Sequence, residues 1–172
     1  VARPVAPIVN AVVASKPAKA AMDVLLDIDK HRTFPKYQSS GFVRWFRKEA
    51  QAEQSAYSEK VAFFHGCSTE YQQPEVGNAF VKVMNAIGYG VTLMDEKCCG
   101  VAMISNGLWN SAERHARHNV REFSKAVAQG MPVVATSSTC VFTMRDEYPD
   151  VLSVDNSAVR DSITLVEPFL YE

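Results

Sequence analysis

The chain has 172 residues, of which 47% are hydrophobic and 22% are charged, and its formal net charge is −1. This balance is typical of a folded globular protein and excludes a wholly disordered chain. Because no basic stripe is interleaved with aromatic residues, we expect no nucleic-acid partner. No apolar stretch approaches the roughly 18 residues of a membrane-spanning helix.

Residues 1–56 predict a helical N-terminal arm. They lack strand patterns, and Ser39 or Ser40 can cap a helix that runs to Ala50. We expect this arm to lie on an α/β domain formed by residues 57–172. The apolar first 26 residues fit packing against another part of the protein, or contact with a membrane surface. The chain begins at Val1 and closes in an apolar stretch, so we expect it to be a piece of a longer protein.

From residue 60 onward, strand and helix patterns alternate. Short apolar runs typical of buried strands lie at residues 61–64, 91–94 and 133–135. Amphipathic patterns predict helices at residues 76–87, 111–127 and 157–169. Strands separated by helices favour right-handed crossovers and a parallel sheet. The sequence therefore predicts a Rossmann-like α/β fold, with helices flanking the sheet.

The four cysteines follow the three predicted strands. Cys67 lies three residues after the first strand, Cys98 and Cys99 lie four and five after the second, and Cys140 lies five after the third. The carboxyl ends of parallel strands meet at one edge, where open α/β sheets bind ligands. We therefore expect the four thiols to converge at one rim of the sheet.

Four converging thiols indicate a metal centre. The adjacent Cys98 and Cys99 suit a multi-iron cluster, and Gly100 allows the backbone to approach it closely. Zinc is the alternative, although structural zinc sites usually use C-x2–4-C pairs, which this chain lacks. Disulfides are disfavoured because neighbouring cysteines have poor geometry for pairing. A thiol enzyme is a third hypothesis, but only His65 stands near a cysteine as a base.

The histidines near these motifs are most simply explained as structural residues and not as metal ligands. His65 is more simply a packed or hydrogen-bonded residue than a ligand, although it lies two residues before Cys67. His115 and His118 have a spacing that could bind a metal on a helix. We expect them instead to lie on a solvated helix face, and we predict no catalytic residue in this chain.

Three short motifs resemble the CCG-type cysteine-rich domain: Gly66-Cys67, residues 97–100 and residues 137–140. This domain occurs in the cysteine-rich subunit of heterodisulfide reductases and in iron–sulfur subunits that serve glycolate, lactate and glycerol-3-phosphate oxidation. Longer stretches are most similar to the iron–sulfur subunits of anaerobic glycerol-3-phosphate dehydrogenases. These stretches are residues 27–32, 64–67, 135–140 and 145–149.

The resemblance implies an iron–sulfur cluster, of the 4Fe-4S type, bound by Cys67, Cys98, Cys99 and Cys140. The family pattern has a fifth cysteine where Ser137 stands, so Ser137 and His65 are auxiliary candidates and the site can be empty in the isolated chain. The implied role is electron transfer from a flavin-containing dehydrogenase subunit, through a membrane-associated subunit, toward quinone. The implied location is peripheral, on the cytoplasmic side of the inner membrane.

Two alternatives to this role stay open. One is a zinc-stabilised module that docks such partners without transferring electrons. The other is the equivalent subunit of a glycolate- or lactate-oxidising system, or of a heterodisulfide reductase. In each case we expect the chemistry on the organic substrate to take place in another subunit.

Overall fold

A four-stranded parallel sheet lies at the centre of the computed structural model, which describes residues 5–171. The strand order is β2-β1-β3-β4, and every neighbouring pair is parallel. This arrangement confirms the predicted α/β class. The strands are β1 (Glu59–Phe64), β2 (Tyr89–Leu93), β3 (Val133–Ala135) and β4 (Ile163–Leu165).

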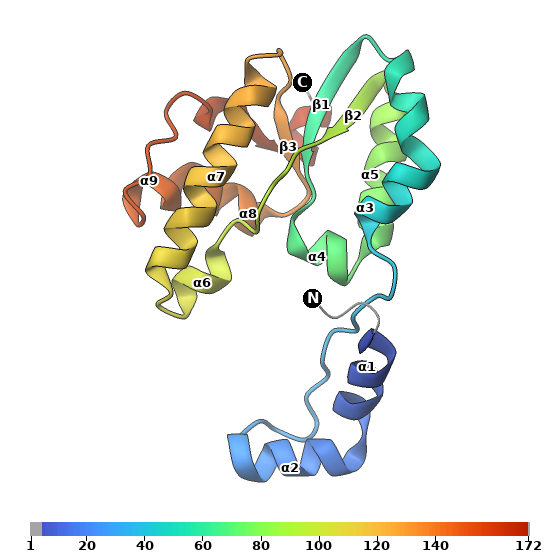
Figure 1. Cartoon of the computed structure of the whole chain (residues 1–172), viewed down its shortest axis with the longest axis vertical. Helices are drawn as coiled ribbons and strands as arrows, with labels where there is room; N and C mark the ends of the chain where they lie inside the picture. The colour runs from blue at the N-terminus through green and yellow to red at the C-terminus, as the bar shows by residue number, and fades with distance from the viewer. Residues whose placement is uncertain (1–4, 172) are drawn as a thin grey trace.

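Helices join and flank these strands (Figure 1). The α-helices are α1 (Ala6–Ala14), α2 (Lys16–Leu26), α3 (Phe42–Trp45), α4 (Gly66–Tyr71), α5 (Pro74–Ala86), α6 (Val101–Ser105), α7 (Trp109–Val127), α8 (Ser138–Phe142), α9 (Tyr148–Asp150) and α10 (Val166–Tyr171). Shorter or wider helical turns are η2 (Phe46–Ala50), η3 (Gln51–Ala56), η4 (Thr143–Glu147) and η5 (Arg160–Ser162).

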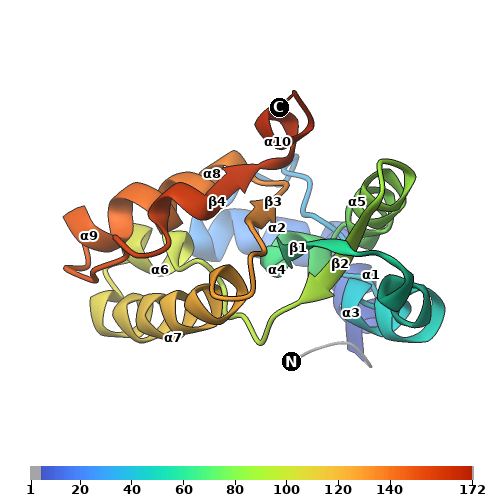
Figure 2. The same cartoon turned by 90° about the horizontal axis from the view of Figure 1, so that it is seen from above.

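Strand β1 is buried on both faces. Val61 and Phe63 pack with α3 and α5, whereas Ala62 and Phe64 pack with α7. None of these four side chains is more than 1% exposed. Figures 1 and 2 show α5 and α7 on opposite sides of the strands. The apolar run at residues 61–64 is therefore a central strand, as its composition predicted.

An aromatic cluster attaches the chain before β1 to the sheet. The ring of Phe42 in α3 lies 5.4 Å from the ring of Phe63, and Phe63 stacks on Phe80 at 3.8 Å. Helix α3 begins at Phe42 after Gly41, without a side-chain cap, so the expected start at Ser39 or Ser40 is wrong. Burial of Phe42, rather than a cap, holds this end of the helix.

Helices α1 and α2 project away from the α/β body (Figure 1). The expectation that the whole arm lies on the domain is therefore correct only for the part from α3 onward. Asn10 of α1 bonds to both backbone groups of Tyr37, at 2.8 and 3.0 Å, and the Gln38 amide donates to the Tyr71 carbonyl at 2.8 Å. None of the helices within residues 5–171 combines the length and apolarity needed to span a bilayer.

The helix expected at residues 157–169 is wrong. The chain instead forms the short turn η5, then strand β4, and only then helix α10. Ile163 is fully buried and aligns with Val133 of β3. Arg145 donates to the Ile163 carbonyl at 2.9 Å. Pairing with β3 therefore overrides a local pattern that also fits a helix.

The close contact between Gly77 of α5 and Phe42 yields a stability prediction. Alanine inside a helix is normally more stable than glycine by roughly 0.5–1 kcal/mol. At Gly77, however, an added Cβ would lie 2.4 Å from Cδ2 of Phe42. Gly77→Ala should therefore lower the free energy of unfolding in urea by about 1–3 kcal/mol. In the Gly77→Ala background, a second change, Phe42→Leu, should make room for the added methyl group and restore part of the lost free energy of unfolding. An increase in the free energy of unfolding on Gly77→Ala alone would contradict this explanation.

Candidate metal centre

The loops after β1, β2 and β3 bring the four thiols together. Cys67 lies in α4, Cys98 and Cys99 lie in the loop after β2, and Cys140 lies in α8. The Cys98 and Cys67 sulfurs are 3.8 Å apart. Cys98 and Cys140 both raise the pKa of the Cys99 thiol, so these three side chains interact electrostatically. Cysteines from α4, from the loop after β2 and from α8, separated by 31 and 41 residues in the sequence, therefore converge at one edge of the sheet.

Two glycines next to the cysteines have backbone conformations that other residues rarely adopt. Gly66 precedes Cys67 at φ 65°, and Gly100 follows Cys99 at φ 101°, which are left-handed values that favour glycine. A Cβ on Gly66 would lie 3.8 Å from the Cys140 sulfur, and a Cβ on Gly100 would lie 3.6 Å from Ala112. The two turns therefore place sulfur atoms beside backbone that has no side chain.

Interactions between neighbouring thiols shift their pKa values in opposite directions. The hydrogen bond between Cys98 and Cys67 is the largest influence that lowers the pKa of Cys98 and that raises the pKa of Cys67. In the same way, Cys99 lowers the pKa of Cys140, and its own pKa is raised. Cys98 and Cys140 are therefore the two cysteines whose pKa values the neighbouring thiols lower. Within residues 5–171, no three His, Cys, Asp or Glu side chains are arranged to hold one metal ion.

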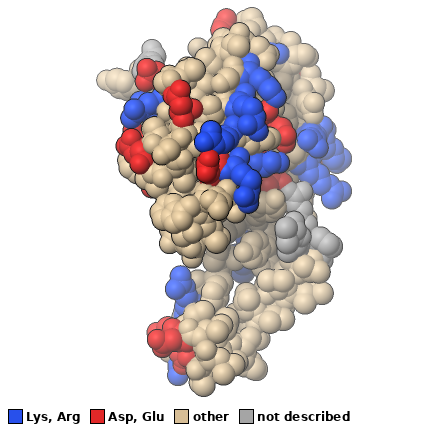
Figure 3. All heavy atoms as spheres, turned by 60° about the vertical axis from the view of Figure 1, so that its left-hand side comes forward, with Lys and Arg blue, Asp and Glu red and all other residues tan. Residues whose placement is uncertain are grey.

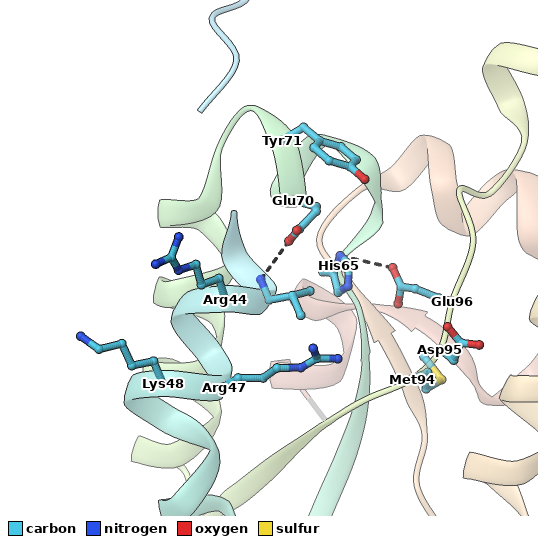
Figure 4. Close-up of a pocket in the computed structure, with 10 residues that line it drawn as sticks. Arg44, Arg47, Lys48, His65, Glu70, Tyr71, Met94, Asp95 and Glu96 are labelled. Atoms are coloured by element: carbon cyan, nitrogen blue, oxygen red, sulfur yellow. Dashed lines mark hydrogen bonds and ion pairs between the residues drawn. The ribbon is translucent and has the colours of Figure 1, made fainter. Parts of the chain in front are cut away.

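Glu96 links the loop after β2 to the start of α4. Its Oε1 accepts the Gly66 amide at 2.7 Å and lies 3.4 Å from Nδ1 of His65 (Figure 4). Its Oε2 is buried without a hydrogen-bond partner among the described residues. Burial raises the pKa of Glu96 and lowers that of His65. The His65 ring also packs 5.5 Å from Phe42, so this histidine has a clear packing role.

Ser137 acts as the N-cap of α8. Its Oγ accepts the Cys140 amide at 3.4 Å, and a hydrogen bond from Ser137 helps to lower the pKa of Cys140. The Ser137 side chain therefore contacts the backbone of Cys140. Its structural role is the usual one for a serine at a helix start.

The two histidines of α7 contact the cysteine loop. Nδ1 of His115 lies 3.2 Å from the Cys98 carbonyl, and Nε2 of His118 bonds to the Asp95 carbonyl. The expectation of a solvated helix face is therefore wrong for this pair. The loop after β2 runs along α7 and contacts both rings, which local helix periodicity could not indicate.

Asn119 is a structural residue that the sequence interpretation missed. Its side chain is fully buried, with Oδ1 accepting the Lys97 amide at 2.7 Å. Its Nδ2 donates to the Lys97 carbonyl and to the Tyr148 hydroxyl, each at 3.0 Å. The signal was present, because Ala112, Ala116, Asn119 and Phe123 follow a 4-3-4 spacing that puts an amide on the buried face.

The fold and these thiols define an α/β domain with a cysteine-rich edge at the carboxyl ends of its strands. Residues 61–145 match the family model named CCG and described as a cysteine-rich domain. The matched segment contains all four cysteines and strand β3, together with β2 and most of β1. Residues 61–145 are therefore similar to the CCG cysteine-rich domain.

Three curated relatives narrow the similarity further. The C subunit of anaerobic glycerol-3-phosphate dehydrogenase from Escherichia coli K12 is 49% identical over 173 residues, which cover 99% of this chain and 43% of that protein. An uncharacterized iron–sulfur protein of Methanococcus maripaludis is 29% identical over 72% of this chain and 24% of its own length. Lactate utilization protein A of an Exiguobacterium species is 32% identical over 55% of this chain and 38% of its own length.

The chain thus spans 43% of the length of the Escherichia coli relative. No solved structure matched the chain.

The buried amide of Asn119 yields a prediction about the loop that bears the cysteine pair. Asn119→Ala removes four hydrogen bonds, one of them a long contact of 3.5 Å to the Cys98 carbonyl, and should lower the free energy of unfolding by roughly 2–4 kcal/mol, at about 1 kcal/mol per bond. Tyr148→Phe deletes one of these partners and should cost only about 1 kcal/mol. Chemical denaturation measures both variants, and equal losses would show that Asn119 does not hold the loop.

Proposed function

We propose that this chain is the iron–sulfur electron-transfer part of an anaerobic glycerol-3-phosphate dehydrogenase. The observation that carries the proposal is the convergence of four cysteines, from the segments that follow β1, β2 and β3, at the carboxyl edge of the sheet. The relative of that name supports it, since the similarity extends over 99% of the chain. The proposed electron-transfer unit is residues 57–172, with residues 1–56 as its arm.

The proposed cofactor is an iron–sulfur cluster of the 4Fe-4S type, held by Cys67, Cys98, Cys99 and Cys140. The donor set fits such a group, because iron–sulfur clusters are bound by cysteine thiolates and the pKa values of Cys98 and Cys140 are lowered. A bound cluster supplies one-electron transfer. The chain's own contribution is to orient four sulfurs and to surround them with buried side chains from α7 and α8.

The proposed partners are a flavin-containing dehydrogenase subunit, which delivers electrons, and a membrane-associated subunit, which passes them toward quinone. With these partners, the chain would be a peripheral protein at the cytoplasmic face of the inner membrane. Oxidation of glycerol 3-phosphate would take place in the flavin subunit, and this chain by itself would not be catalytic. The relative's name, which makes it one subunit of a dehydrogenase, is consistent with such an assembly.

Anaerobic reconstitution followed by iron, sulfide and zinc analysis tests the cofactor. Cys67→Ser and Cys98→Ser should each lower iron and sulfide content several-fold while the far-UV circular dichroism stays unchanged, because strands β1 to β3 have their own apolar core. Ser68→Ala changes an exposed neighbour of Cys67 and should keep full iron content. Stoichiometric zinc without sulfide would instead support the zinc-stabilised docking module.

Ser137 allows the family's fifth ligand position to be tested directly. Ser137→Cys should raise the iron bound per chain and change the visible absorption of the cluster, because it adds a thiol at the start of α8. Ser138→Cys is the matched control, since it adds a thiol one residue away at an exposed position. Equal iron content in both variants would count against placing a ligand at residue 137.

A further inference from the structure

A pocket lies beside the cysteine loops, on the other side of His65 and Glu96. Its volume is about 710 Å³, and it opens between the α3–η2 segment and the chain that follows β1 and β2 (Figure 4). Such a volume is sufficient for a small molecule. The pocket also lies at the carboxyl edge of the sheet, where open α/β folds bind ligands.

The acidic side chains around this pocket are already engaged. Glu70 accepts the Val43 amide at 2.8 Å, and Glu96 accepts the Gly66 amide at 2.7 Å. Asp95 is largely exposed and lies 3.7 Å from the His118 ring nitrogen and 4.0 Å from the Lys97 amine. Each carboxylate of the lining therefore has at least one donor or cation within 4.0 Å, and among the buried oxygens of these three acids only Oε2 of Glu96 lacks a partner among the described residues.

Two guanidinium groups of the same lining have no such partners. Arg44 and Arg47 make no ion pair or side-chain hydrogen bond with any described residue, whereas Lys48 pairs with Glu49 at 2.9 Å. Figure 4 shows Arg47 extending from η2 into the pocket toward Met94 and Asp95, while Arg44 points outward. Among the described residues, a cation without an ionic partner thus reaches into a pocket whose acids are occupied.

We propose that this pocket binds a small oxyanion, a carboxylate or a phosphate, with the Arg47 guanidinium as its principal donor. A guanidinium presents a planar fork that matches either oxyanion with two parallel hydrogen bonds. Arg44 adds positive charge at the rim, and His65 forms part of the inner wall. This site is separate from the thiols and does not depend on the identity of the metal.

The basic residues of α7 provide a matched control surface. Arg117 pairs with Glu113 at 2.8 Å, and the exposed Arg121 lies on the same outer helix face. Figure 3 shows Lys and Arg on this side of the molecule interspersed with acidic residues. Arg121→Gln therefore removes one exposed charge without altering the pocket.

Calorimetry with inorganic phosphate and, separately, acetate tests the proposal on the purified chain. Arg47→Gln should weaken binding about tenfold or more, because a hydrogen-bonded ionic contact is lost. Arg47→Lys keeps the charge but not the fork and should lose less. Arg121→Gln should leave the affinity unchanged. Preference for phosphate or for acetate then identifies which of the two oxyanion classes the pocket takes.

Imidazole resonances locate the bound anion independently. The chain has four histidines, and of these only His65 is among the residues that line this pocket. Phosphate should shift the His65 signals in the metal-free chain and leave those of His31, which lies in the arm, unchanged. Absence of binding, equal affinity of the Arg47→Gln variant, or shifts confined to His31 in the arm would each overturn the proposal.

Discussion

Parallel pairing of β1 with both β2 and β3 is the constraint on which the rest of the structure depends. Because β1 lies between these two strands, the three chain segments that follow them leave the sheet at the same edge. Burial of β1 on both faces fixes its register, since a shift of one residue would exchange the sets of side chains that meet α5 and α7. The positions of the cysteines are therefore a consequence of sheet packing.

Most of the central fold could be predicted because its strands are short and uniformly apolar. The runs at residues 61–64, 91–94 and 133–135 correspond to β1, β2 and β3 within two residues at each end. Strand β4 could not be predicted, because Ile163 becomes a strand residue only through its position beside β3. The direction in which α1 and α2 project could not be predicted either. Sequence periodicity shows which face of a helix is apolar, but it does not show which part of the protein that face packs against.

The thiols of the candidate centre were predictable for a different reason. Each cysteine lies a few residues after a strand, so parallel topology alone brings them to one edge. The groups that support them come from elsewhere in the chain. Asn119 reaches Lys97 across 22 residues, and Glu96 reaches Gly66 across 30. Such pairings depend on how α7 and the loops pack, which no local pattern specifies.

The strand order also determines when the site can be completed during synthesis. Cys67, Cys98 and Cys99 precede Cys140, which follows the strand β3 that pairs with β1. A nascent chain that has emerged only through α7 therefore offers three thiols and no fourth. Full assembly of the donor set therefore has to wait until β3 and residue 140 have both left the ribosome.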